Sequence, residues 1–106
     1  MKKVFVSVAV RGLTKEQTVA KHAEYKEKIT GIIGEYEDIS DDVSGFHESK
    51  TPDVKYPPVY WIGKGLTNEM ANADLVAFCG DISQTRGCKV EKLICELYDI
   101  PYIVIK

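Results

Sequence analysis

The residues best suited to chemistry lie close together near the start of one predicted helix. Arg86 and Gly87 precede Glu91 in a segment that reads Arg-Gly-Cys-Lys-Val-Glu. The planar guanidinium of arginine suits phosphate and carboxylate groups. A glycine at a helix start permits close ligand approach, and the free amides there favour an anion. Glu91, four residues after Gly87, would lean back over a residue without a side chain. The alternative is that Glu91 is a plain charged residue on an amphipathic helix.

A second arginine adds to this set. The chain has two arginines, Arg11 and Arg86, against twelve lysines. Arg11 follows the first predicted strand, and Arg86 follows the third. If both loops lie at the ligand-binding edge of a sheet, the pair would bind an anionic group. The alternative is that each arginine is a solvated surface residue.

Alternating strands and helices would position these side chains. A capping box from Thr14 to Gln17 predicts where the first helix begins, and Gly34 predicts where it ends. A long loop over residues 40–57 is typical of a lid or binding segment. The predicted strands are residues 3–10, 36–39, 74–79 and 102–105, and the predicted helices are residues 15–33, 58–72 and 86–98.

Each predicted helix carries apolar residues at helical spacing, which would face the core. In the first helix these are Tyr25, Ile29, Ile32 and Ile33, with Tyr36 beyond. In the second they are Val59, Ile62, Leu66 and Met70. In the third they are Val90, Leu93, Ile94 and Leu97.

Strands alternating with helices predict an α/β fold with a parallel sheet and helices on both faces. The simplest doubly wound arrangement has four strands in the order 2-1-3-4, in one domain over residues 1–106. Ligands bind such sheets beyond the carboxyl ends of the strands, here where strands one and three diverge.

Composition excludes several classes of function. The net charge is −2, from 14 Lys and Arg against 16 Asp and Glu, which argues against binding a nucleic-acid polymer. No apolar run is long enough for a membrane helix, and no secretory signal is evident. Three cysteines without a CxxC spacing indicate neither a disulfide framework nor a zinc site. We expect a cytoplasmic protein with no metal and no cofactor.

The chain resembles a known superfamily in three segments. These are Val4-Phe5-Val6-Ser7 with Arg11-Gly12, Asn72-Ala73-Asp74-Leu75-Val76, and Arg86-Gly87-Cys88-Lys89-Val90-Glu91. Together they resemble the nucleoside 2-deoxyribosyltransferase-like superfamily, in particular its small bacterial and phage branch. The resemblance implies a flavodoxin-like three-layer α/β/α fold. It also implies cleavage or transfer at the N-glycosidic bond of a nucleoside or nucleotide.

The resemblance assigns roles to particular residues. Glu91 matches the family's glutamate nucleophile, which would trap the sugar as a covalent glycosyl intermediate. The first-strand loop, which lines the sugar and phosphate in the family, corresponds to Ser7, Arg11 and Gly12. Arg86 and Gly87 match the phosphate-side loop, and Gly80 closes the third strand beside it.

The chain also departs from the family pattern. Thr85 stands where characterised transferases carry an aspartate, and Gly65 or Leu66 stands where they carry an acid on the preceding helix. Asp81, at the end of the third strand, would be the substitute acid. These departures leave open a non-catalytic protein that sequesters or senses a nucleotide. They also leave open an interaction subunit in which the charged residues are surface groups. Because relatives often complete their sites with a neighbouring subunit, we expect a homo-oligomer.

Overall fold

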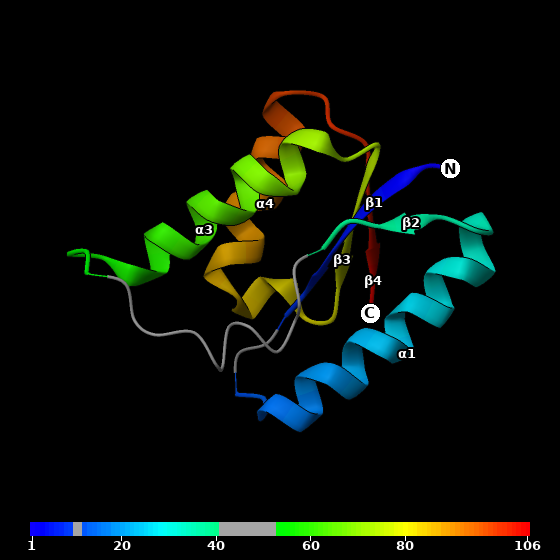
Figure 1. Cartoon of the computed structure of the whole chain (residues 1–106), viewed down its shortest axis with the longest axis horizontal. Helices are drawn as coiled ribbons and strands as arrows, with labels where there is room; N and C mark the ends of the chain where they lie inside the picture. The colour runs from blue at the N-terminus through cyan, green and yellow to red at the C-terminus, as the bar shows by residue number, and fades with distance from the viewer. Residues whose placement is uncertain (10–11, 41–52) are drawn as a thin grey trace.

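In a computed structural model, which describes residues 1–9, 12–40 and 53–106, four parallel strands form one sheet in the order β2-β1-β3-β4. Helix α1 covers one face of the sheet, and α3 and α4 cover the other (Figure 1). This arrangement confirms the predicted flavodoxin-like three-layer α/β/α fold and its strand order. The strands are β1 (Lys3–Val8), β2 (Glu37–Asp38), β3 (Leu75–Cys79) and β4 (Tyr102–Ile105); the helices are α1 (Lys15–Ile33), α3 (Pro57–Asn68) and α4 (Arg86–Leu97), with short 3-10 turns η1 (Met70–Asn72) and η2 (Ile82–Gln84).

The two central strands are buried on both faces. Side chains alternate along β1, so Val4 and Val6 pack in the cluster with α1, whereas Phe5 packs in the cluster beneath α3 and α4. By the same alternation Ser7 faces α3 and α4. Ser7 is opposite Phe78 of β3 in the parallel register. A polar side chain is therefore buried near the carboxyl end of β1.

Helix α1 has the predicted bounds. Thr14 accepts a hydrogen bond from the backbone of Gln17, and the Gln17 side chain accepts one from the backbone of Thr14, as expected of a capping box. Gly34 ends the helix with a φ of +82°. Ile29 is fully buried, but Ile32, placed in the same predicted apolar stripe, is 61% exposed.

Helix α3 is shorter than predicted and buries fewer residues. It ends at Asn68, and η1 continues to Asn72. The prediction that Val59 is buried was wrong, since it is 64% exposed. The reason lies in the contact with α4: a Cβ on Gly87, the second residue of α4, would lie 3.8 Å from Ile62. Val59 is one turn before Ile62 and so projects past the beginning of α4.

Helix α4 turns a different face to the sheet from the one predicted. Its buried residues are Cys88, Glu91 and Cys95. The predicted apolar stripe is largely outside: Val90, Leu93 and Leu97 are 40%, 53% and 67% exposed, and Ile94 alone packs against the core. The two cysteines pack as small apolar residues and bring the helix onto the sheet.

Strand β2 is only two residues long, and one side chain extends its pairing. The Ser40 hydroxyl accepts a hydrogen bond from Val6 N and donates one to Val6 O. These bonds replace ladder bonds that a longer strand would make. No helix in the described ranges is long and apolar enough to cross a membrane.

Candidate functional site

Glu91 is a buried carboxyl beneath two helices. It lies on the inner face of α4, is 8% exposed, and shares that face with Cys88 and Cys95. Buried carboxyl groups are rare unless they have partners, because desolvation disfavours their charge. Its position between the sheet and α3 therefore requires polar contacts.

Ser7 supplies one of these contacts from the sheet. Its hydroxyl donates a hydrogen bond of 2.9 Å to Glu91 Oε1 and lies 3.5 Å from Cys88 Sγ. Ser7 is itself only 7% exposed. The bond links the penultimate residue of β1 to the inner face of α4, and it orients the Glu91 carboxyl. The structure thus brings together two residues that the sequence analysis had singled out.

A second buried glutamate lies beside the first. A Cβ placed on Gly65 of α3 would lie 3.6 Å from Glu91 Oε2 and 3.7 Å from Glu69 Oε2. The two carboxylate oxygens are therefore no farther apart than the sum of these distances. Glu69 is 3% exposed. Both carboxyl groups therefore lie within van der Waals contact of the Cβ position of Gly65.

The sequence analysis missed Glu69, although a signal for it existed. Glu69 follows Gly65 by four residues, the same spacing that separates Gly87 from Glu91. Helical side chains lean toward the N-terminus, and Glu69 Oε2 accordingly lies near the Cβ position of Gly65. Glu91 does not lie over Gly87 as expected: the Cβ position of Gly87 meets Ile62, and the Glu91 carboxyl instead reaches Gly65 of α3.

Burial changes the proton affinity of Glu91. Desolvation raises its pKa from 4.5 to about 7, against the opposing effect of the hydrogen bond from Ser7. Burial likewise raises the pKa of the neighbouring Cys88 thiol to about 11, so this sulfur stays protonated at neutral pH. The acid in this site that changes its charge near neutral pH is thus Glu91 rather than Cys88.

The candidate residues after β3 lie at the carboxyl edge of the sheet. Gly80 has a φ of +96°, and its N–H donates to Ile105 O at 2.8 Å. Asp81 is exposed and caps η2, where its carboxylate accepts a hydrogen bond from Ser83 N at 3.2 Å. Asp81 thus serves a local turn, and its carboxylate is far more accessible to water than those of Glu69 and Glu91.

The remaining candidates begin α4 or follow β1. Arg86 is exposed at the first position of α4, two residues before Cys88, the first buried residue of the helix. Gly87 packs toward Ile62 of α3. Gly12 is exposed, with a φ of +80° that favours glycine. The predicted anion-binding Arg11 lies outside the described residues.

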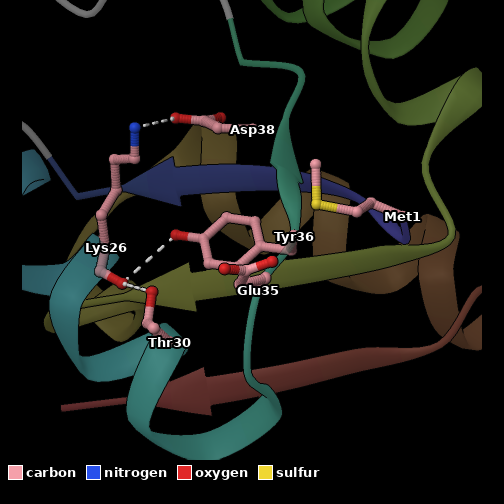
Figure 2. A pocket seen from close by; sticks show the side chains of 6 residues that line it. All are labelled: Met1, Lys26, Thr30, Glu35, Tyr36 and Asp38. Atoms are coloured by element: carbon pink, nitrogen blue, oxygen red, sulfur yellow. Dashed lines mark hydrogen bonds and ion pairs between the residues drawn. The ribbon is translucent and has the colours of Figure 1, made fainter.

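A separate pocket of about 380 Å³ lies at the other end of the sheet (Figure 2). It is lined by Met1, Lys26, Thr30, Glu35, Tyr36 and Asp38. Lys26 Nζ lies 3.5 Å from Asp38 Oδ2, and Tyr36 donates a hydrogen bond to Lys26 O. Because these groups pair with one another, the pocket lacks a set of polar side chains directed at one point, such as the set around Glu91.

The arrangement of Glu91, Glu69 and Ser7 is suited to acid–base or nucleophilic chemistry at one small centre. Two carboxyl groups close to one point can divide the roles of acid and nucleophile between them. Ser7 fixes the orientation of one of them. Comparison with family models, with curated proteins and with solved structures finds no match for this chain.

Proposed function

We propose that the protein binds a nucleoside or nucleotide and cleaves or transfers at its N-glycosidic bond, with Glu91 as the nucleophile. The observation that carries the proposal is the buried pair of carboxyl groups. Glu91 and Glu69 both approach the Cβ position of Gly65, and Glu91 is hydrogen-bonded to Ser7, which lies next to last in β1 near the carboxyl edge of the sheet. Ligands bind at this edge in doubly wound sheets.

The reaction would use Glu91 in its ionised form. A carboxylate oxygen would attack C1′ of the sugar, and the bond from C1′ to the base nitrogen would break with its electrons leaving on the base. The product is a glycosyl ester of Glu91 and a free base. Water, or a second base, would then attack C1′ and release the carboxylate. Because burial raises the pKa of Glu91 to about 7, this step would weaken as the pH falls below 7.

Glu69 is the candidate acid for the leaving base. Its proton would pass to the base nitrogen as the glycosidic bond breaks, and its carboxylate would then take a proton from the attacking water. Glu69 is better placed for this role than Asp81, because Glu69 and Glu91 approach the same point at Gly65. The carboxylate of Asp81 instead faces Ser83.

The charged end of the ligand would lie at the beginning of α4. Arg86 stands at the first helical position, where backbone N–H groups are free to bind an anion. Arg11, which follows β1 in the sequence, would add a second guanidinium. These groups favour a 5′-phosphate on the sugar over a neutral nucleoside.

The test is base release from a panel of nucleosides, nucleoside monophosphates, NAD and cyclic nucleotides. The wild-type protein should release free base from at least one of them, as measured by chromatography with mass detection. Glu91→Gln should abolish release but keep binding, since glutamine has the same shape. Glu27→Gln, on the exposed side of α1, is the matched control and should release base like the wild type.

Two results would contradict this proposal. Equal base release by Glu91→Gln and wild type would show that Glu91 is not the nucleophile. Recovery of an intact ligand after denaturation, with no base released from the panel, would instead identify a nucleotide-sequestering protein. In that case Arg86→Ala should lose the ligand, whereas Glu91→Gln should retain it.

A further inference from the structure

The outer face of α4 carries an apolar stripe that the fold does not cover. Val90, Leu93 and Leu97 are 40%, 53% and 67% exposed. Their spacing of three and four residues is that of the contact positions in a pair of packed helices. Glu91 and the cysteines occupy the opposite face of the same helix. The stripe therefore lies on the opposite face of α4 from Glu91, and Arg86 precedes it by four residues on the same face.

The charges beside this stripe run against the helix dipole. Helices favour acidic residues in the first turn and basic residues in the last. Helix α4 has neither: no acidic residue occurs in its first turn and no basic residue in its last. It instead begins with Arg86 and Lys89 and carries Glu96 in its final turn. Within one chain this order is unfavourable, so it calls for another explanation.

We infer that the stripe is the contact surface of a homodimer in which α4 of one copy packs antiparallel against α4 of a second copy. The order of the charged residues along α4 indicates that the partner is a second copy of the chain and that the two helices run antiparallel. Lys89 and Glu96 are seven residues apart and so lie along the same edge of the stripe, one on each side of Leu93. In an antiparallel pair related by a twofold axis, Lys89 of each copy lies next to Glu96 of the other.

The alternative orientation is disfavoured by the same residues. A parallel pair would place the edge that carries Lys89 and Glu96 on opposite sides of the contact in the two copies, so Lys89 of one copy would not meet Glu96 of the other and this attraction would be lost. Within its own chain Glu96 accepts hydrogen bonds from Lys92 at 2.9 Å and from the Tyr102 hydroxyl at 3.1 Å, both at Oε1. These bonds hold the carboxylate in place beside the stripe, which lowers the entropy that pairing with a second copy would cost.

Sedimentation velocity of the full chain, from about 1 μM to about 1 mM, tests this inference. The wild type should shift from monomer to dimer with concentration. Leu93→Lys places like charges near the twofold axis and should stay monomeric throughout. Ile32→Lys is the matched control: it changes an apolar residue that is 61% exposed on α1, on the opposite face of the sheet, and should leave the dimer intact.

A charge exchange tests the orientation separately. Lys89→Glu should weaken the dimer roughly tenfold by placing two acidic groups together. Adding Glu96→Lys should restore it, because each pair regains opposite charges. A wild type that stays monomeric would overturn the inference, as would equal effects of Leu93→Lys and Ile32→Lys. A double variant as weak as Lys89→Glu would overturn the antiparallel arrangement. These readouts concern assembly alone, so they stand or fail independently of base release.

Discussion

At the scale of single residues, Glu91 links the pH dependence of stability to the candidate chemistry. Its pKa is about 7 in the folded chain, against 4.5 for an ordinary glutamate. Below pH 4.5 the Glu91 carboxyl is protonated in both the folded and the unfolded chain, so its ionisation does not lower the free energy of unfolding. As the pH rises from 4.5 to 7 the unfolded chain releases its proton first, so stability falls. Above pH 7 the loss is complete, at about 3 kcal/mol.

Replacing Glu91 with glutamine should therefore stabilise the protein at high pH. Glu91→Gln keeps the shape and can still accept the hydrogen bond from Ser7, but it has no charge to desolvate. We expect a gain of about 3 kcal/mol in the free energy of unfolding at pH 8 and little change at pH 4. Urea unfolding at the two pH values measures both. An equal effect at pH 4 and pH 8 would show that ionisation of Glu91 is not the cause.

The hydrogen bond from Ser7 partly offsets the burial of Glu91. Ser7→Ala removes a bond that lowers the pKa of Glu91, so this pKa should rise further above its ordinary value. NMR titration of the side-chain carboxyl carbon, assigned by its absence in Glu91→Gln, measures the shift. Ser83→Ala, an exposed serine outside this site, should leave that titration unchanged. A lower pKa in Ser7→Ala would contradict the argument.

At the scale of elements, the contact between α3 and α4 brings the two buried carboxyl groups to one glycine, Gly65. The inner side of α4 brings Glu91 toward Gly65, and Glu69 approaches the same point from just beyond the end of α3. The two helices run in the same direction at this contact, since Ile62 meets Gly87 and Gly65 meets Glu91. The meeting of the two carboxyl groups is thus a property of the helix pair rather than of either helix alone.

Adding a methyl group at position 65 should raise the stability of the protein but lower its activity. A Cβ at position 65 would be in ordinary contact with both carboxylates, so Gly65→Ala should fold and gain roughly 0.5–1 kcal/mol from helix propensity. Its methyl group would occupy the room beside the carboxyl groups and lower base release by about tenfold or more. Gly63→Ala, where a Cβ meets open space, should gain similar stability without losing activity. Equal rates in the two variants would contradict the role given to Gly65.

At the scale of the whole molecule, two carboxyl groups on opposite faces of the sheet set the pH range of greatest stability. Asp38 joins β2 to α1: its Oδ2 lies 3.3 Å from His22 Nε2. Burial would raise the pKa of Asp38, but hydrogen bonds from His22 and Ser40 outweigh it and lower the pKa to about 2. Its contribution is present above an ordinary aspartate pKa and is lost as the pH falls toward 2.

The two effects together predict greatest stability between roughly pH 4 and 5. Stability should fall below this range because Asp38 is protonated, and above it because Glu91 ionises. Urea unfolding from pH 2 to pH 8 would show both limbs. Asp38→Asn should flatten the acidic limb and Glu91→Gln the other, whereas Glu37→Gln, exposed on β2, should change neither. A stability maximum above pH 7 would contradict this assignment.

Much of the architecture could be predicted because its signals are local. The capping box at Thr14 and the glycine at position 34 gave the bounds of α1, and the alternation of strands and helices gave the order of the sheet. Glu91 was singled out by its spacing after Gly87 and by the resemblance, and Ser7 by the resemblance alone; the structure adds that they are in direct contact.

The orientation of a helix was harder to predict. In α4, Val90, Leu93 and Leu97 repeat with the same period as Cys88, Glu91 and Cys95, and periodicity alone cannot say which set faces the sheet. Hydrophobicity favoured the first set, yet packing against the sheet and α3 selected the second. Glu69 was missed for a related reason, because its burial depends on how two helices approach each other.

The three buried thiols make the opening of each face of the sheet separately measurable. Cys79 belongs to the core cluster beneath α1, whereas Cys88 and Cys95 belong to the cluster beneath α3 and α4. A thiol reagent reacts with such groups only when local structure opens. If α3 and α4 detach to admit a ligand while α1 stays packed, Cys88 and Cys95 would be labelled well before Cys79. The order of labelling would then show which face of the sheet opens first.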